Sequence, residues 1–165
     1  MTLESLNELY LSELSALYNA EKQLIKTLPK IIQKTDSAQL RQALKTHLEE
    51  AYDQTARLEW VYEVHGENPN KQRNKSVESL LAEGEEMVGS DAAPAARDAA
   101  IIAALQRVKH YEIAVYSTAR TYAQQLGHDA TAAVLQETLE EEIAANDNLT
   151  GAAARRIQAT RTAGE

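Results

Sequence analysis

The chain has 165 residues, a formal net charge of −8, six Gly, three Pro and no Cys. This length fits a single domain, residues 1–165, and the lack of Cys excludes disulfides, thiolate metal sites and cysteine nucleophiles. The acidic balance argues against a nucleic-acid partner, because phosphate binding requires clustered Lys and Arg. The longest apolar run, residues 99–105, is far shorter than the ~20 residues that span a bilayer, and residues 1–4 do not resemble a secretory signal. We therefore expect a soluble, cytoplasmic protein without a membrane partner.

The composition predicts an all-α fold. Ala (28 residues) and Glu (19 residues) are good helix formers, whereas the helix breakers Gly and Pro are scarce. Apolar residues that recur every three or four positions indicate four long amphipathic helices and one short helix. The expected helices span about residues 5–34, 37–65, 77–88, 94–126 and 129–157.

Local signals indicate where these helices begin and end. Ser5 and Glu8 have the spacing of a capping box at the start of the first helix, and Ser37 is a candidate N-cap for the second. Pro94 suits the first turn of the third long helix, and Gly127 suits the end of that helix. The first two long helices are joined by a tight turn, as are the last two, so each pair is expected to be antiparallel.

The connection between the two antiparallel pairs is long. About 29 residues, 66–94, separate the second long helix from the third. A segment of this length can cross a bundle from end to end, which a short loop cannot do. The sequence therefore predicts a four-helix bundle with one long crossover that contains the short fifth helix, the connectivity of ferritin-like folds.

Polar residues interrupt each apolar stripe near the middle of its helix. They are Glu21 in the first helix, His47, Glu50 and Gln54 in the second, Glu112 in the third long helix, and Glu142 and Asn146 in the last. Four helices are therefore expected to direct a carboxylate inward at a similar depth. A buried, unpaired carboxylate costs on the order of several kcal/mol, so this group of acids requires compensation.

Three kinds of compensation are compatible with these residues: protonation of the acids, pairing with Lys or Arg, or a pair of divalent metal ions. Bridging Glu side chains can hold two metal ions ~3.5–4 Å apart. Carboxylate oxygens and one imidazole suit iron(II) or manganese(II) better than a structural zinc ion. His47 lies three residues before Glu50 and shares its helix face. The expected metal ligands are Glu21, His47, Glu50, Glu112 and Glu142, with Glu141, Asp53 and Asn146 as further candidates.

Two tyrosines lie one helical turn from these acids. Tyr18 shares a face with Glu21, and Tyr116 shares a face with Glu112. Each tyrosine could relay electrons to a metal centre or pack in the core with its hydroxyl hydrogen-bonded. His110 is a weaker ligand candidate, because it points away from Glu112.

Several segments together resemble a known bacterial family. They are NAEKQL at 19–24, HLEE at 47–50, QTARL at 54–58, HYEIA at 110–114 and ETLEEE at 137–142. Over about residues 5–155 the chain resembles the YciE/YciF-type ferritin-like proteins, small bacterial proteins linked to stress responses. The resemblance implies a helical bundle that forms a homodimer and contains a two-metal centre. It also implies that Glu21, Glu50, Glu112 and either Glu141 or Glu142 are ligands.

The ligand pattern differs from that of iron-oxidising ferritins and rubrerythrins, which carry Glu-x-x-His motifs. Here Asp53 follows Glu50 by three residues, and Ala145 follows Glu142 by three. Relatives of the YciE/YciF type often have Asp where Asn146 stands. The expected site is therefore rich in carboxylates, with His47 as its one imidazole.

Two functions are compatible with these observations. In the first, the protein binds two iron or manganese ions; Glu50 and either Glu112 or Glu142 would bridge them, with Glu21 and His47 as terminal ligands. If catalytic, such a protein would oxidise iron(II) with oxygen or peroxide, or dispose of peroxide. In the second, the protein is a metal-free helical scaffold or dimeric stress-induced interaction protein whose inward acids are protonated or water-bridged.

Overall fold

The computed structural model describes residues 5–69, 73–89 and 92–162, apart from the side chains of residues 88–89 and 152–162. Its helices are α1 (Leu6–Lys34), α2 (Ala38–Val64), α3 (Lys75–Gly89), α4 (Pro94–Gln125) and α5 (Asp129–Thr162). All regular structure within the described ranges is helical, which confirms the predicted all-α class. None of these described helices is long and apolar enough to cross a membrane.

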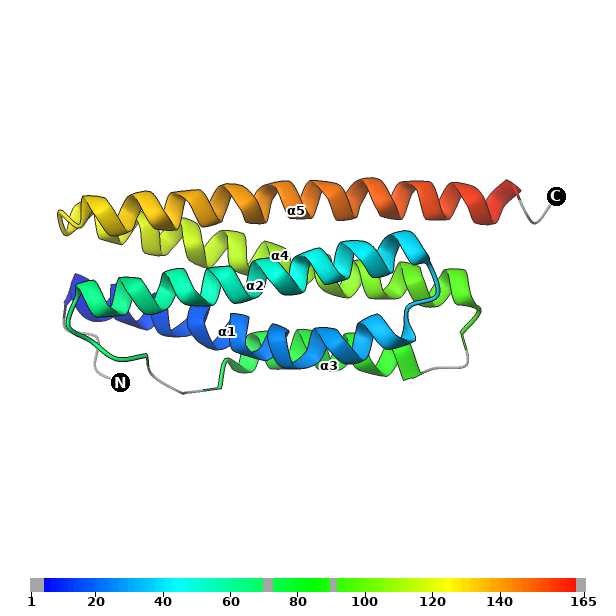
Figure 1. Cartoon of the computed structure of the whole chain (residues 1–165), viewed down its shortest axis with the longest axis horizontal. Helices are drawn as coiled ribbons and strands as arrows, with labels where there is room; N and C mark the ends of the chain where they lie inside the picture. The colour runs from blue at the N-terminus through cyan, green and yellow to red at the C-terminus, as the bar shows by residue number, and fades with distance from the viewer. Residues whose placement is uncertain (1–4, 70–72, 90–91, 163–165) are drawn as a thin grey trace.

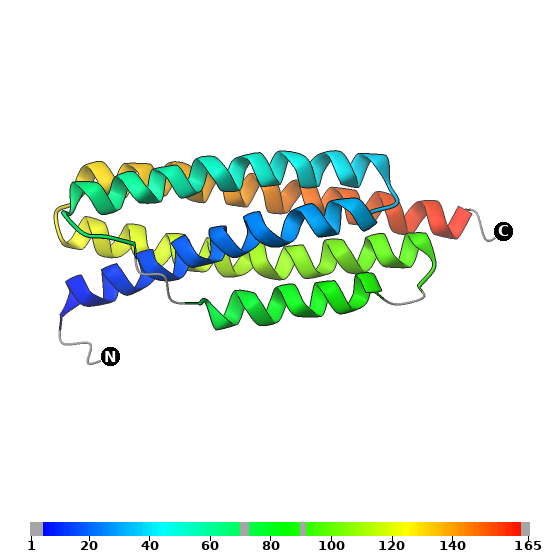
Figure 2. The ribbon, with the colours of Figure 1, turned by 60° about the horizontal axis from the view of Figure 1, so that its bottom comes forward.

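The helices α1, α2, α4 and α5 run alongside one another as a bundle (Figure 1). The short helix α3 lies outside this bundle and packs against α4 and α1 (Figure 2). The segment that contains α3 carries the chain along the bundle, so α4 begins at the end opposite to the one where α2 stops. The predicted ferritin-like bundle with one long crossover and a short fifth helix is therefore confirmed.

The predicted boundary signals act as expected in α1, α2 and α4. The backbone N–H of Glu8 donates to Ser5 Oγ (3.2 Å) and the Ser5 N–H donates to the Glu8 carboxylate (3.1 Å), which completes a capping box. The side chain of Ser37 caps α2. Gly127 follows the end of α4 with φ +75°, a left-handed conformation that disfavours residues with a Cβ.

The helix α3 begins two residues earlier than predicted, because Asn74 caps it. The Val77 N–H donates to Asn74 Oδ1 (3.2 Å). The amide of Asn74 also donates to the Ala16 carbonyl (2.9 Å) and to the Tyr111 hydroxyl (2.7 Å). One buried side chain therefore starts α3 and ties the crossover to α1 and α4.

A buried aspartate holds the α1–α2 turn against the start of α4. Both oxygens of the Asp98 carboxylate accept backbone N–H groups, from Asp36 (3.1 Å) and from Ser37 (3.0 Å). Sequence reasoning missed this contact, because an acid in the first turns of a helix is also explained by the helix dipole alone.

The apolar core consists of two clusters at different levels of the bundle. One contains Tyr10, Leu14, Leu17, Leu58, Val61, Val115, Ala119, Leu135 and Leu139. The other contains Leu24, Leu28, Leu40, Leu44, Ile101, Leu105, Val108 and Leu149. Along α2, α4 and α5 a polar stretch separates the two, and this stretch contains the predicted ligands.

Candidate metal centre

Five buried polar side chains from all four bundle helices converge between the two apolar clusters. They are Glu21 from α1, His47 from α2, Lys109 and Glu112 from α4, and Glu142 from α5, and they are called the inner cluster below. Glu21, Lys109, Glu112 and Glu142 are 0% exposed. The inward carboxylates predicted on α1, α4 and α5 are the Glu21, Glu112 and Glu142 side chains of this cluster.

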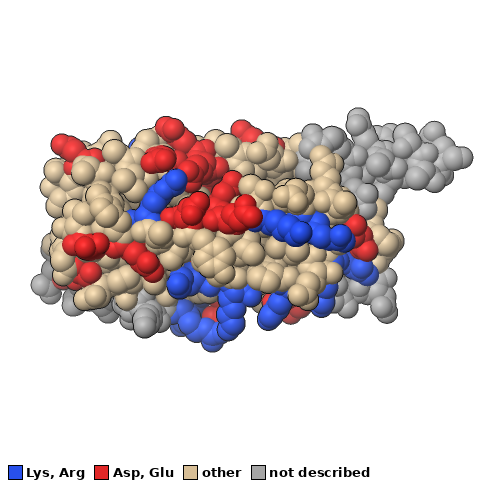
Figure 3. Space-filling model, in the orientation of Figure 1, with Lys and Arg blue, Asp and Glu red and all other residues tan. Residues whose placement is uncertain are grey.

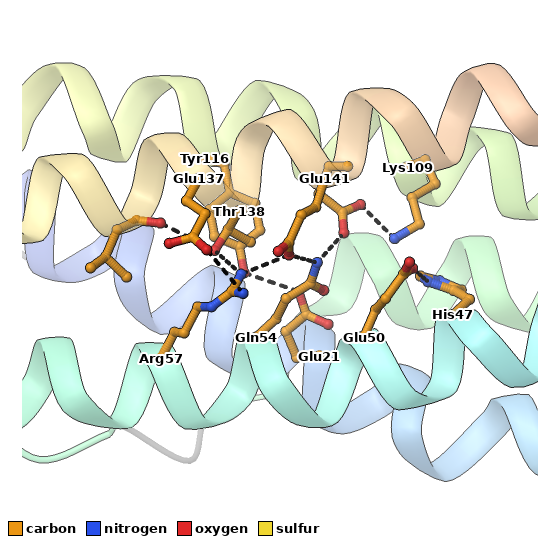
Figure 4. Close-up of polar contacts among 12 residues, drawn as sticks. Glu21, His47, Glu50, Gln54, Arg57, Lys109, Tyr116, Glu137, Thr138 and Glu141 are labelled. Atoms are coloured by element: carbon orange, nitrogen blue, oxygen red, sulfur yellow. Dashed lines mark hydrogen bonds and ion pairs between the residues drawn. The ribbon is translucent and has the colours of Figure 1, made fainter.

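A lysine that the sequence analysis did not consider lies within this group. The Lys109 ammonium is 2.5 Å from Glu142 Oε2 on α5, a contact drawn as a dashed line from Lys109 in Figure 4. It is also 3.3 Å from Glu112 Oε2. Lys109 follows Leu105 by four residues and precedes Glu112 by three, so helical spacing alone puts it on the inward face. Periodicity could therefore have found it, although Lys is a residue type that is rarely buried.

The surroundings of Lys109 keep its side chain charged. Burial lowers the pKa of the Lys109 ammonium, but the carboxyl groups of Glu112, Glu142 and Glu21 raise it by more, so it lies above its ordinary value. The ammonium and the Glu142 carboxylate therefore form an ion pair inside the core.

Burial favours the neutral, protonated form of the other two buried acids, Glu21 and Glu112. Burial and, to a smaller extent, the nearby Glu142 raise the pKa of Glu21 to about 8, against the lowering effects of Lys109 and a hydrogen bond from Tyr116. Burial also raises the pKa of Glu112 well above its ordinary value, with Lys109 acting in the opposite direction. The Glu21 carboxyl group is therefore largely protonated near neutral pH, and that of Glu112 takes up a proton more readily than an exposed carboxyl group does.

Several atoms of this region are buried and lack a hydrogen-bond partner. They are Glu21 Oε2, both carboxylate oxygens of Glu112, both ring nitrogens of His47, and Gln54 Oε1. Burial lowers the pKa of His47 to about 3, so its ring is neutral and able to coordinate a metal. An unsatisfied buried polar atom costs ~1–3 kcal/mol, so these atoms lower the stability of the folded protein unless a further group satisfies them.

The donor types fit a divalent cation. Carboxylate oxygens and a neutral imidazole suit iron(II) and manganese(II), and the unpaired atoms belong to side chains from three helices. Within the described residues, no three His, Asp or Glu side chains already stand together as a metal-binding group. The Lys109 ammonium instead lies between Glu112 and Glu142.

Glu50 differs from the other predicted carboxylates because it lies at the edge of the core. Its side chain is 35% exposed, and its Oε2 is 3.7 Å from His47 Nδ1. A pocket of about 310 Å³ between α2, α4 and α5 is lined by His47, Glu50 and Lys109, together with apolar residues such as Leu44 and Leu105. This pocket gives a small solute a path to the inner cluster.

Acidic side chains gather on the surface where α2 and α5 lie next to each other (Figure 3). A concentration of negative charge raises the local concentration of cations. The polar edge of the pocket therefore lies on a face that attracts positively charged solutes.

A second acidic group lies outside the core, also between α2 and α5. It consists of Arg57, Glu137 and Glu141 and is called the outer cluster below. Arg57 Nη1 donates to Glu141 Oε2 (2.7 Å), and Arg57 Nη2 lies 3.4 Å from Glu137 Oε1. Although partial burial raises the pKa of Glu141, hydrogen bonds from Arg57 and Gln54 bring it below its ordinary value. Glu141 therefore belongs to the outer cluster, and Glu142 is the inward member of the pair.

The remaining candidates differ in their contact with the inner cluster. Tyr116 donates its hydroxyl to Glu21 Oε1 (3.0 Å), whereas Tyr18 donates to the surface residue Glu59 (3.1 Å). Asp53 is exposed. Asn146 is half-buried, and its buried Oδ1 has no hydrogen-bond partner.

Comparisons with known proteins agree with the fold. Residues 5–162 match a protein family described as a domain of unknown function, DUF892. The chain is 42% identical to protein YciF of Escherichia coli (strain K12) over 152 residues, which are 91% of each protein. The crystal structure of the E. coli stress protein YciF matches with a TM-score of 0.91 and 38% identity, over 94% of this chain and 98% of that chain. YcfI from Rhodopseudomonas palustris matches with a TM-score of 0.86 and 38% identity, over 90% and 94%. The resemblance inferred from sequence is thus confirmed, and the chain belongs to the DUF892 family.

Proposed function

We propose that the inner cluster binds a divalent metal ion, iron(II) or manganese(II), in a stress-associated ferritin-like protein. The proposal depends on the buried atoms without a hydrogen-bond partner on Glu21, His47 and Glu112, of which only Glu112 Oε2 has an ion-pair partner, Lys109. Folded proteins rarely leave such atoms without a partner, and a cation bound among them would satisfy all three side chains. The description of the E. coli relative YciF as a stress protein supports the stress association.

The protein groups around the cluster would hold the ion and its ligands in place. Glu21, Glu112 and His47 would bind it, and Glu50 would approach from the pocket. The Tyr116 hydroxyl keeps one Glu21 oxygen occupied and leaves Oε2 without a partner. Bound iron or manganese supplies one-electron redox chemistry. The resemblance implies two such ions, and their number depends on Lys109.

Metal analysis and thermal melting test this proposal. Protein stripped with a chelator is incubated with manganese(II), or anaerobically with iron(II), desalted, and analysed for retained metal. Ligand at 100 times its Kd adds about 2.7 kcal/mol to the free energy of unfolding, which corresponds to roughly 5–10 °C in Tm for a chain of this size. A chelator is expected to reverse the increase.

A matched pair of variants locates the binding. Because Glu112 carries a raised pKa, Glu112→Gln resembles its protonated form and is expected to keep the metal-free Tm while losing the metal-dependent increase. Glu49→Gln removes the same charge at an exposed position of α2 and is expected to respond as the native chain does. Absence of retained metal, or an unchanged response of Glu112→Gln, would contradict the proposal.

Metal binding does not by itself make the protein an enzyme, so catalysis needs its own test. Consumption of oxygen or peroxide by the iron(II)-loaded protein would establish an oxidoreductase that oxidises iron(II) or disposes of peroxide. Retained metal without such consumption would leave a metal-binding protein.

A metal-free scaffold is the second candidate, and one observation favours it. The Lys109–Glu142 ion pair already neutralises part of the buried charge, and the raised pKa values of Glu21 and Glu112 allow protons to neutralise the rest. The relative YcfI has itself been given a proposed structural role. In this case the native chain retains neither metal and its Tm does not respond to chelator.

The homodimer implied by the family resemblance is a further proposal. Tyr52, Trp60 and Val64 expose apolar surface on α2 and are 56%, 41% and 51% exposed. Apolar surface of this kind is available for association with a second copy. Sedimentation equilibrium is expected to give the mass of two chains, and the mass of one chain would contradict the proposal.

A further inference from the structure

The place between Glu112 and Glu142 is occupied by a cationic group of the protein itself. The Lys109 ammonium is in contact with one carboxylate from α4 and one from α5. In a two-metal carboxylate site, each cation likewise lies between carboxylates supplied by different chain segments, with the second cation ~3.5–4 Å away. The ammonium therefore stands where one cation of such a pair would stand.

The Lys109 side chain is held firmly in this position. It is 0% exposed, and Gln54 fixes its partner by donating to Glu142 Oε1 (2.8 Å). Moving the ammonium away would leave the Glu142 carboxylate buried without its counter-charge, which is strongly unfavourable. A metal ion that entered beside Glu142 would have to displace a charge that the fold already supplies.

The remaining donor atoms of the inner cluster without a hydrogen bond come from three side chains. Glu21 Oε2, Glu112 Oε1 and the His47 ring nitrogens have no hydrogen-bond partner, and Lys109 is not in contact with Glu21 or His47 through any hydrogen bond or ion pair of the described structure. Together with Glu50 at the pocket, they make four side chains. A single iron(II) or manganese(II) ion takes about four to six ligands, so water would complete the set. Two ions would share the same few donors.

Repulsion between cations points the same way. With Glu21, Glu50, Glu112 and Glu142 all ionised and the ammonium in place, one divalent ion leaves a net charge of −1 and two leave +1. The second ion would also bring like charges together in a medium of low dielectric constant.

We propose that the Lys109 ammonium replaces one cation of the expected pair, so that the inner cluster binds a single divalent metal ion per chain. This inference depends on the proposed metal-binding function and specifies its stoichiometry. It assigns Lys109 the role of a built-in counter-ion, which positions Glu142 and does not bind metal.

Manganese(II) stoichiometry in the native chain and in Lys109→Met tests this inference. Met keeps the length of the side chain without its charge. The native chain is expected to retain one ion per chain with the electron paramagnetic resonance spectrum of an isolated manganese(II). Lys109→Met is expected to retain two ions with the spectrum of an exchange-coupled pair. Lys45→Met, which removes a charge at an exposed position of α2, is expected to match the native chain.

The outcomes separate the two claims. Two ions in the native chain, or one ion in Lys109→Met with unchanged affinity, would overturn the role of Lys109 and leave the metal site intact. Retention of no manganese(II) and no iron(II) by either chain would overturn the metal site itself. If Lys109→Met does not fold, Lys109→Gln, which can still donate to Glu142, is measured in its place with the same expected result.

Discussion

Glu141 and Glu142 are neighbours on α5, yet they belong to two different kinds of acidic site. Glu141 lies in the outer cluster, where Arg57 and Gln54 donate to its carboxylate and its pKa lies below the ordinary value (Figure 4). Glu142 lies in the inner cluster, where its partner Lys109 is fully buried and also lies 3.3 Å from the adjoining Glu112. These two adjacent residues therefore differ in surroundings: Glu141 pairs with a partly exposed arginine, and Glu142 pairs with a fully buried lysine.

The two clusters differ in how far protein groups satisfy their polar atoms. The outer cluster is complete, because its charges are paired by protein groups that remain in contact with water. The inner cluster is buried but leaves atoms of Glu21 and His47 without hydrogen-bond partners. Such atoms add nothing to stability, and the proposed metal ion would satisfy them.

The largest expected effect comes from removing the inner cation in metal-free protein. Lys109→Met leaves the Glu142 carboxylate buried and unpaired, which is expected to lower the free energy of unfolding by about 3–5 kcal/mol. Urea denaturation in the presence of chelator measures this change, with Lys45→Met as the exposed control. A loss no larger than that of the control would show that Lys109 does not balance the buried acids.

Glu21 and Glu141 are expected to contribute to the pH dependence of stability with opposite signs, and His47, whose pKa burial lowers to about 3, acts in the same direction as Glu141. Glu21 has a folded-state pKa of about 8, above its ordinary value of 4.5, so the folded state holds a proton that the unfolded state has lost between these values. The contribution of Glu21 is therefore complete below about pH 4.5 and is lost as the pH rises through 8, at up to about 1.4 kcal/mol per pH unit. The lowered pKa of Glu141 acts the other way, and its contribution is lost as the pH falls.

Urea denaturation between pH 5 and pH 8 with chelator present tests this contrast. Glu21→Gln retains an acceptor for the Tyr116 hydroxyl and removes the titration, so it is expected to flatten the decline in stability on the alkaline side. A Glu21→Gln variant whose stability changes with pH between 5 and 8 in the same way as that of the native chain would contradict the protonated state of Glu21.

The smallest effect is expected in the outer cluster. Glu141→Gln removes an ion pair whose side chains are 34% and 28% exposed, so screening by water limits the loss to about 1 kcal/mol or less. Metal retention is expected to be unchanged. Thermal melting and elemental analysis measure both quantities, and loss of metal from Glu141→Gln would show that the boundary between the clusters is drawn in the wrong place.

Local sequence signals predicted the fold well because they depend on neighbours in the chain. The capping box of Ser5, the glycine after α4 and the three-four spacing of apolar residues are all readable within one or two turns. The same spacing correctly indicated that Glu21 and Glu112 point inward. It could not distinguish Glu141 from Glu142 within a run of three acids, because one residue of helical rotation decides between them.

The features that were missed depend on partners in other helices. Lys109 is buried because Glu142, 33 residues away, pairs with it, and Asp98 is buried because it accepts two N–H groups from the α1–α2 turn. Residue type alone assigns both to the surface. Glu50 shares the helix face of His47 but lies at the pocket, since α2 and α5 approach each other less closely than the other neighbouring pairs in the bundle.

A crystal soaked in manganese(II), with anomalous scattering recorded, tests the contrast between the two clusters most directly. The account predicts one anomalous peak per chain, within ligand distance of Glu21 and Glu112, and none at Arg57 and Glu141. A peak at the outer cluster alone, or no peak in the inner cluster at saturating manganese(II), would contradict it.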